Sequence, residues 1–309
     1  MTDVIDTLSG PGFDSLYARE IEPELRKLEA ERQVAMRRSQ LLWLGFAVLL
    51  VVEGLITLAV TAGRTFIPAE PVLLITVIGG AVIGYLPLQF VAGKTKRRLI
   101  ETLCTPMGVT YEIKPSEPAA YDRLLALKLL PHPDDKTFED MFEGRRGMSA
   151  FMLCEATLST GSGKNRRTVF RGQIFSIEFP RKFLGTTVVL RDSGWLNRFE
   201  CPKGLEKVGL EDPHFEKVFE VFGDDQVEAR AILTPTFMEH LLALETAYSG
   251  DHLRCGFCEG RLVIAIEGKD RFEVGSMFST LDDRGRAESM AGDIRAVFNL
   301  IDAFVANLR

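Results

Sequence analysis

Two long apolar runs, separated by only eight residues, constrain the fold of this chain more than any other feature. They cover residues 41–62 and 71–92, and each is 22 residues long. A helix rises about 1.5 Å per residue, so about 20 residues cross the roughly 30 Å hydrocarbon core of a bilayer. Glu53 is the sole Asp, Glu, Lys or Arg in the two runs. The sequence therefore predicts a transmembrane helical hairpin, and the alternative is a buried pair of helices in a soluble protein.

The cations that flank the two runs predict how the hairpin is oriented. Lys and Arg beside a span resist translocation and stay in the cytoplasm. The segment between the runs carries one cation, Arg64, which Glu70 offsets. We therefore expect both termini and the main domain in the cytoplasm, with the flanking cations fixing the topology and contacting lipid head groups. These cations are Arg37, Arg38, Lys94, Lys96, Arg97 and Arg98.

Glu53 is the residue of the hairpin that most needs an explanation. It lies twelve residues into the first run, about 18 Å from the cytoplasmic end of a straight helix. A carboxylate at that depth is costly unless it is protonated, paired or facing water. Counting back twelve residues from the end of the second run gives Gly80, which with Gly79 and Gly84 forms a small-residue face suited to close helix contact. We predict that Glu53, in its neutral form, packs on this face within the hairpin or in an oligomer. The alternative is a carboxyl group with a local hydrogen bond.

Residues 1–40 are predicted to form a cytoplasmic amphipathic helix. Apolar residues recur at helical spacing over residues 13–39, and Pro23 either kinks this helix or begins a new one. The second half is expected to run straight into the first span. Its apolar stripe could pack on the cytoplasmic domain, meet a partner helix or lie along the membrane surface.

The remainder of the chain is predicted to be a cytoplasmic α+β domain. Residues 94–148 are interpreted as a helical linker followed by a charged loop, and residues 149–309 as a mostly antiparallel sheet with helices. A long amphipathic helix over residues 284–308 is expected to cover this sheet. Strands are predicted at residues 149–157, 167–179, 186–191 and 215–221, and in a hairpin around Glu259-Gly260.

No motif in the sequence identifies a reaction. The net charge of -6 argues against a nucleic-acid partner, which would want a basic surface. Cys255 and Cys258 are predicted to lie on a strand, where residues three apart point to opposite faces and suit neither redox nor zinc chemistry. Residues 161–164 lack the spacing of a phosphate-binding loop, and the acidic residues 134–143 lack that of a calcium loop. We therefore expect no cofactor, no metal and no catalytic residue, and an enzyme is the less favoured class.

Several short motifs, in their order along the chain, resemble those of a known family. The first runs from Phe13 to Arg32 and includes Leu28-Glu29. The double span follows, and then come Phe170-Arg-Gly172, Asp225-Gln-Val-Glu-Ala-Arg230 and Leu233-Thr-Pro235. Together they resemble, over nearly the whole chain, the bacterial domain-of-unknown-function family 3137. The resemblance implies a bacterial inner-membrane protein with a cytoplasmic domain and no established enzyme activity, and it supplies no catalytic residues. It also implies a LemA-like membrane protein as a candidate partner, because such proteins are encoded beside some members.

These observations favour a membrane-anchored scaffold or interaction module that assembles through its hairpin, as a homo-oligomer or with a protein partner. The alternative is a membrane-bound enzyme or small-molecule sensor whose site is a tertiary pocket in the α+β domain. A channel that uses Glu53 is a third reading, and it requires several copies because two spans form a pore only by oligomerising.

Overall fold

The structure of the protein is a computed structural model that describes residues 8–62, 70–179, 183, 185–192, 202–247, 252–273 and 275–306. The chain divides into two compact units. The hairpin unit consists of Gly10–Thr102 and Val274–Met290. The sheet unit consists of Met1–Ser9, Leu103–Glu273 and Ala291–Arg309.

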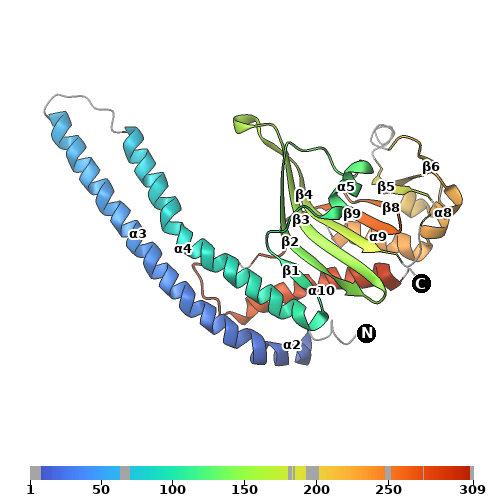
Figure 1. Ribbon diagram of the computed structural model, residues 1–309, viewed down its shortest axis with the longest axis horizontal. Coiled ribbons are helices and arrows are strands. Elements are labelled where there is room, and N and C mark those ends of the chain that lie inside the picture. The colour runs from blue at the N-terminus through green and yellow to red at the C-terminus, as the bar shows by residue number, and fades with distance from the viewer. Residues whose placement is uncertain are drawn as a thin grey trace. The chain divides into compact units, whose positions relative to one another are not determined.

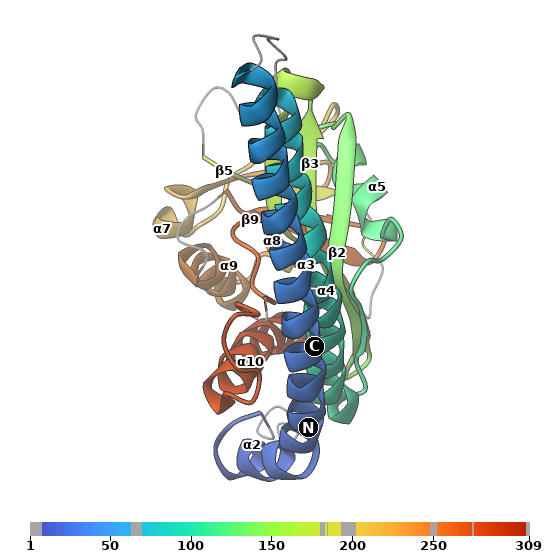
Figure 2. The same ribbon diagram turned by 90° about the vertical axis from the view of Figure 1, so that its left-hand side faces the viewer.

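Two long helices, α3 (Glu22–Ala62) and α4 (Glu70–Cys104), form the frame of the hairpin unit. As predicted, α3 runs without interruption from the polar N-terminal segment through the first apolar run. Figure 2 shows α3 lying along α4. A short helix, α2 (Gly10–Leu16), and a π-helical turn, η1 (Tyr17–Ile21), precede α3.

Pro23 lies in the first turn of α3, which continues the helix of α2 and η1 without a gap. Proline has no N–H to donate to the carbonyl four residues earlier, so the helix must adjust its hydrogen bonds at this point. The widened turn η1 lies directly before it, where the amide of Glu22 donates to the carbonyl of Tyr17, five residues back. Of the two predictions for Pro23, a distortion within one helix is therefore the better description.

The sheet unit contains, within the described residues, one sheet of nine strands (Figure 1). The strand order is β1-β2-β3-β4-β9-β8-β5-β7-β6. Every neighbouring pair is antiparallel, which agrees with the prediction of a mostly antiparallel sheet. The strands are β1 (Thr110–Glu112), β2 (Asp135–Arg146), β3 (Ser149–Thr160), β4 (Arg167–Glu178), β5 (Thr187–Arg191), β6 (Glu206–Val208), β7 (Phe219–Gly223), β8 (Arg254–Cys258) and β9 (Arg261–Glu267). The remaining helices are η2 (Thr105–Met107), α5 (Ala119–Ala126), η3 (Gly163–Asn165), α7 (Pro213–Glu216), α8 (Gln226–Ile232), α9 (Pro235–Ala247) and α10 (Arg284–Ala306).

Apolar side chains cover the sheet on both faces. On one face Tyr121 of α5 packs edge-on against Phe138 of β2, with ring centroids 5.2 Å apart. On the other face Phe298 of α10 packs edge-on against Phe151 of β3, with centroids 5.5 Å apart. The part of α10 that belongs to the sheet unit therefore covers the sheet, in agreement with the prediction. Strand β3 is buried almost throughout, because it pairs on both edges and is covered on both faces.

The prediction of a charged loop at the end of residues 94–148 is wrong, because residues 135–146 form strand β2. The charges of β2 lie mostly on exposed positions, whereas Phe138, Asp140 and Phe142 are buried. Phe138 pairs with Ala156 and Phe142 with Leu153, so the two rings lie on opposite faces of the sheet. A bulge interrupts the pairing at this point, and Asp140 has a positive φ of 54°. Because this stretch of the sequence has few apolar residues among many charges, it resembled a solvated loop.

Two further expectations concern turns and short helices. The strand predicted over residues 215–221 begins later, at Phe219, because Asp212 caps a helix that Pro213 starts. The hairpin around Glu259-Gly260 is confirmed. Both of its turn residues have positive φ, 50° and 72°, as a two-residue turn of type I′ requires.

Candidate functional site

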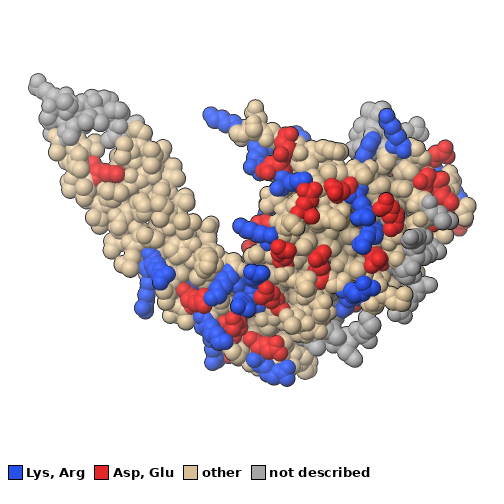
Figure 3. Space-filling model, viewed as in Figure 1, with Lys and Arg blue, Asp and Glu red and all other residues tan. Residues whose placement is uncertain are grey.

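The surface of the two long helices is unusual for a soluble unit, because large apolar side chains face outward over most of it. Leu41 is 68% exposed, Ile75 70% and Phe90 79%. Figure 3 shows the helices tan over most of their length, with charged side chains gathered at the end that carries α2. Both helices are long and apolar enough to cross a membrane. A core helix of a soluble protein can be equally long and apolar but is mostly buried, whereas 0% of the apolar segment of the first helix and 22% of that of the second are buried. Other exposed side chains include Leu44, Val48, Val51, Leu55, Leu58, Leu74, Val82 and Leu86.

Side-chain contacts fix the register between α3 and α4. Gly80 faces the ring of Phe46, and a Cβ atom placed on Gly80 would lie 2.8 Å from Phe46 Cγ. Gly84 faces the indole of Trp43, which a Cβ atom there would overlap. Gly79, in contrast, has open space where its side chain would be. The small-residue face therefore exists at Gly80 and Gly84, and aromatic rings of α3 fill it.

Glu53 does not meet these glycines within the hairpin, so that form of the prediction needs correction. The hydroxyl of Thr76 donates to Glu53 Oε1 at 2.9 Å, one helical turn from Gly80. The other oxygen, Oε2, is buried and has no hydrogen-bond partner among the residues that the structure describes. The sequence placed Gly80 opposite Glu53 on the assumption that the start of the first apolar run and the end of the second lie at the same level. In the structure the residue opposite Glu53 is Thr76, so the two runs are offset by about one helical turn. The structure instead matches the alternative of a carboxyl group with a local hydrogen bond, while contact in an oligomer stays a prediction.

The predicted topology cations fall into two groups. Lys94 donates to Glu31 at 2.6 Å, and Glu101 lies 3.0 Å from Arg97 and 4.0 Å from Arg98. Lys96 is buried. Arg37 and Arg38, which precede the first apolar run, are exposed and form no ion pair with any residue in the described part of the chain.

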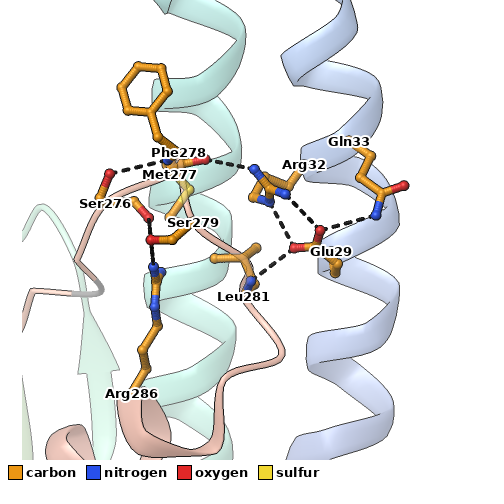
Figure 4. Close-up of polar contacts among 9 residues, drawn as sticks. All are labelled: Glu29, Arg32, Gln33, Ser276, Met277, Phe278, Ser279, Leu281 and Arg286. Carbon is orange, nitrogen blue, oxygen red and sulfur yellow. Dashed lines mark hydrogen bonds and ion pairs between the residues drawn. The ribbon is translucent and has the colours of Figure 1, made fainter.

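A segment that the sequence did not single out is bound to α3. Residues 275–283, here called the strap, precede α10 and lie against the side chains of Glu29 and Arg32 (Figure 4). Arg32 donates to the carbonyl of Met277 at 2.9 Å, and Glu29 accepts a 2.9 Å hydrogen bond from the amide of Leu281. Between themselves the two side chains form two hydrogen bonds of 2.8 Å, and Gln33 donates a further one of 3.1 Å to Glu29. One buried ion pair thus holds the strap at two points.

Hydrogen bonding keeps this ion pair charged. The hydrogen bonds from Arg32, helped by that from the Leu281 amide, lower the pKa of Glu29 to about 2 against the opposing effect of burial. The carboxylate in turn raises the pKa of Arg32. Because a buried charge without a partner is costly, each member of the pair depends on the other.

Phe278 of the strap contacts aromatic residues of both apolar runs. Its ring stacks near Trp43 and near Tyr85, with centroid distances of 6.4 and 6.1 Å and interplanar angles of 20°. Phe278 is nevertheless 59% exposed. Trp43 lies at the start of the first run and Tyr85 in the second half of the second run. Aromatic side chains of this kind are common where a protein meets the surface of a bilayer.

A sequence signal for the strap site existed in the N-terminal motif. Glu29 and Arg32 are three residues apart and interrupt the apolar stripe that Leu25 and Leu28 belong to. Charges on the buried face of a helix need partners, and i, i+3 spacing lets these two pair. Nothing in the sequence indicated that the strap would complete the site.

The sheet unit also has buried ionisable groups. Glu155 of β3 accepts hydrogen bonds from Gln173 at 3.0 Å and from the amide of Arg271 at 2.9 Å. Burial raises its pKa to about 7. The hydroxyl of Tyr111 on β1 donates to Asp140 on β2 at 2.5 Å. These groups lie inside the sheet unit and bind one another, as structural polar groups do.

Cys255 and Cys258, for which the sequence predicts neither a redox nor a zinc role, are buried, and so are Cys104 and Cys154. Burial raises the pKa of the thiols of Cys104, Cys154, Cys255 and Cys258, so the reactive thiolate is disfavoured. Cys201 lies outside the described residues. Over the residues described, no cluster of three or more His, Cys, Asp or Glu side chains has the spacing to hold a metal ion.

Comparisons with known proteins extend these observations. Residues 168–305 match the family model described as "Protein of unknown function (DUF3137)". The match contains Phe170-Arg-Gly172 and the motifs from Asp225 to Pro235, whereas the N-terminal pattern and the double span lie outside it.

The chain is similar to a solved structure described as the crystal structure of the mycobacterial trehalose monomycolate transport factor A, TtfA. It is 9% identical, covers 66% of this chain and 95% of its own, and has a TM-score of 0.35. No curated protein matches the chain. Over residues 168–305, the match to the DUF3137 family model confirms the resemblance inferred from the short motifs.

Proposed function

We propose that the protein is a two-span protein of the bacterial inner membrane whose hairpin anchors a cytoplasmic α+β domain that acts as a scaffold or interaction module. The observation that supports the anchor best is the outward exposure of the apolar side chains of α3 and α4. Soluble monomers rarely expose contiguous apolar patches of more than a few hundred Å². Insertion into a bilayer would remove this surface from water.

The orientation rests on the positions of the cations. Arg37 and Arg38 lie at one end of the α3 apolar run, and Lys94 to Arg98 follow the α4 run at the same end of the hairpin. By the positive-inside rule this end faces the cytoplasm. The sheet unit, whose chain continues from α4, would then be cytoplasmic as well.

The scaffold role is supported by the shapes of two recesses in the sheet unit, one of which is filled by side chains and the other open to solvent. The recess lined by Phe142, Leu153, Phe272 and Phe298 is filled by rings and has no room for a water molecule. An open depression of about 380 Å³ lies beside Arg171. A surface of this kind can contact a partner, and a LemA-like membrane protein or a second copy of the chain is the partner we propose.

Membrane extraction tests the anchor. Full-length protein should stay in the membrane pellet after washing at alkaline pH and enter solution only with detergent. A fluorescent protein fused after Arg309 should fluoresce, whereas a periplasmic reporter at the same position should be inactive and one inserted between the two apolar runs should be active. Release of the protein without detergent, or the reverse reporter pattern, would contradict the proposal.

Assembly tests the scaffold role. The detergent-solubilised chain is expected to elute as a homo-oligomer or with a co-expressed LemA-like protein, and a version with an unrelated two-span hairpin should lose this association. A monomer that carries a bound metabolite would instead favour the enzyme or sensor alternative.

A further inference from the structure

An open groove of about 610 Å³ lies between α3 and α4 at the end of the hairpin that we assign to the cytoplasm. Val34 and Ala35 of α3 and Pro87 and Phe90 of α4 make most of it apolar. Phe90 is 79% exposed, so most of its aromatic ring faces away from the residues that the structure describes.

The charges of the groove leave one cation in excess. Glu31 and Arg38 also line it, two helical turns apart on α3. Lys94 neutralises Glu31 through a 2.6 Å ion pair. Arg38 has no acidic partner in the part of the chain that the structure describes, so the groove favours an anion at this end.

The register of the helices places the groove at a boundary. Trp43 faces Gly84 and Lys94 pairs with Glu31, so Arg38 lies at about the level of the last turns of the α4 apolar run. At this level α4 still presents apolar side chains, whereas α3 already presents a guanidinium group. A lipid at the surface of a bilayer offers the same combination, because its phosphate adjoins its acyl chains.

We propose that this groove binds one anionic phospholipid, with the phosphate on Arg38 and the glycerol and first methylene groups of an acyl chain over Pro87 and Phe90. The proposal rests on the proposed membrane anchoring. Each cation near an anionic membrane surface contributes about 1 kcal/mol, which corresponds to a preference of about five-fold for an anionic over a zwitterionic lipid.

The test uses the full-length chain in detergent, titrated with phosphatidylglycerol or phosphatidylcholine, with the number of bound lipids read by native mass spectrometry and the thermal midpoint read in parallel. Wild-type protein should retain one phosphatidylglycerol with about five-fold preference and a higher midpoint. Arg38→Gln should lose the preference. Arg37→Gln is the matched control, because it removes the same charge from the adjacent residue, which does not line the groove.

A second variant tests the apolar half of the site without altering charge. Val34→Trp should fill the groove and displace the lipid, whereas Val48→Trp, on an exposed position further along α3, should not. Inorganic phosphate alone should give no stabilisation, because it lacks the apolar part of the ligand.

Three results would overturn the inference. Equal losses in Arg37→Gln and Arg38→Gln would indicate general attraction to anionic lipid, and full stabilisation by inorganic phosphate would indicate a soluble anion. A change of oligomeric state in Val34→Trp would indicate that a second copy occupies the groove. Each of these results leaves the alkaline-wash test of membrane anchoring unaffected, so failure of this inference and failure of the proposed function are distinguishable.

Discussion

Arg32 donates two hydrogen bonds of 2.8 Å to Glu29, and these two side chains of α3 hold opposite ends of the strap. Arg32 binds the carbonyl of Met277, and Glu29 binds the amide of Leu281 (Figure 4). A helix that continues into an apolar run thereby holds the segment that leads into α10. The ion pair is buried, and its contribution to stability can be tested against an exposed ion pair on the same helix.

Arg32→Met should destabilise the hairpin unit by about 3 kcal/mol, because it leaves the buried carboxylate of Glu29 without its cation. The matched control is Arg26→Met. Arg26 pairs with Glu22 at 2.5 Å but is 72% exposed, so its loss should cost about 0.5 kcal/mol or less. Hydrogen exchange of the detergent-solubilised chain gives the readout, since the Leu281 amide should exchange much faster in Arg32→Met alone. Equal exchange in the two variants would show that the pair does not hold the strap.

Acid should release the strap. The pKa of Glu29 is lowered to about 2 in the folded chain from an ordinary value of 4.5. Its contribution to the free energy of unfolding is therefore complete above pH 4.5 and is lost as the pH falls toward 2. Hydrogen exchange at Leu281, corrected for the intrinsic rate, should rise over this interval in the wild type. In Glu29→Gln the exchange should be faster at neutral pH and should not change with acid, and an unchanged wild-type profile would argue against a charged pair.

Glu155 should give the opposite pH dependence in the sheet unit. Burial raises its pKa to about 7, so the folded state binds a proton more tightly than the unfolded state does. The stability due to this group is complete below pH 4.5, falls as the pH rises to 7 and is constant above, with a total change of at most about 3 kcal/mol. Thermal melts from pH 4.5 to 8 should show this slope in the wild type and in Glu139→Gln, an exposed position on the adjacent strand. The slope should vanish in Glu155→Gln, and its persistence there would assign it to another group.

Phe278→Ala should loosen the strap without unfolding it. Stacking on Trp43 and Tyr85 is worth about 1 kcal/mol, and the ring is already 59% exposed. The chain has two tryptophans, so a Trp195→Phe background lets Trp43 report alone. The emission of Trp43 should change in Phe278→Ala and return in Phe278→Tyr, which keeps a ring. No change in Phe278→Ala would indicate that the ring does not reside there in solution.

The hairpin could be predicted from sequence because its signal is local and strong. Each apolar run defines its own helix, and the amphipathic residues 284–308 likewise indicated α10. The register between the helices could not be predicted in this way. It is set by how Trp43 and Phe46 fit the glycines of α4, which shifts the partner of Glu53 by one turn from Gly80 to Thr76.

Strand β2 and the strap were missed for a different reason, because their conformations depend on residues far along the chain. β2 has few apolar side chains and is held by pairing with β1 and β3. The strap lies about 250 residues from its partners on α3. A single sequence shows the unusual charges Glu29 and Arg32, but it does not show what they bind.

The glycines of α4 should differ in their tolerance of a methyl group, although all three were predicted to form one face. Gly84→Ala places a Cβ atom inside the indole of Trp43 and should destabilise the hairpin by about 1 to 3 kcal/mol, because both backbones must move apart. Gly79→Ala meets nothing within 4 Å and should be neutral or slightly stabilising, since alanine favours the helix. The measurement is the thermal midpoint of the full-length chain in detergent, and Gly84→Ala with Trp43→Ala should recover much of the loss. Equal midpoints for Gly84→Ala and Gly79→Ala would contradict the register between α3 and α4, whereas a loss in Gly79→Ala alone would indicate that the open face of α4 contacts a second copy.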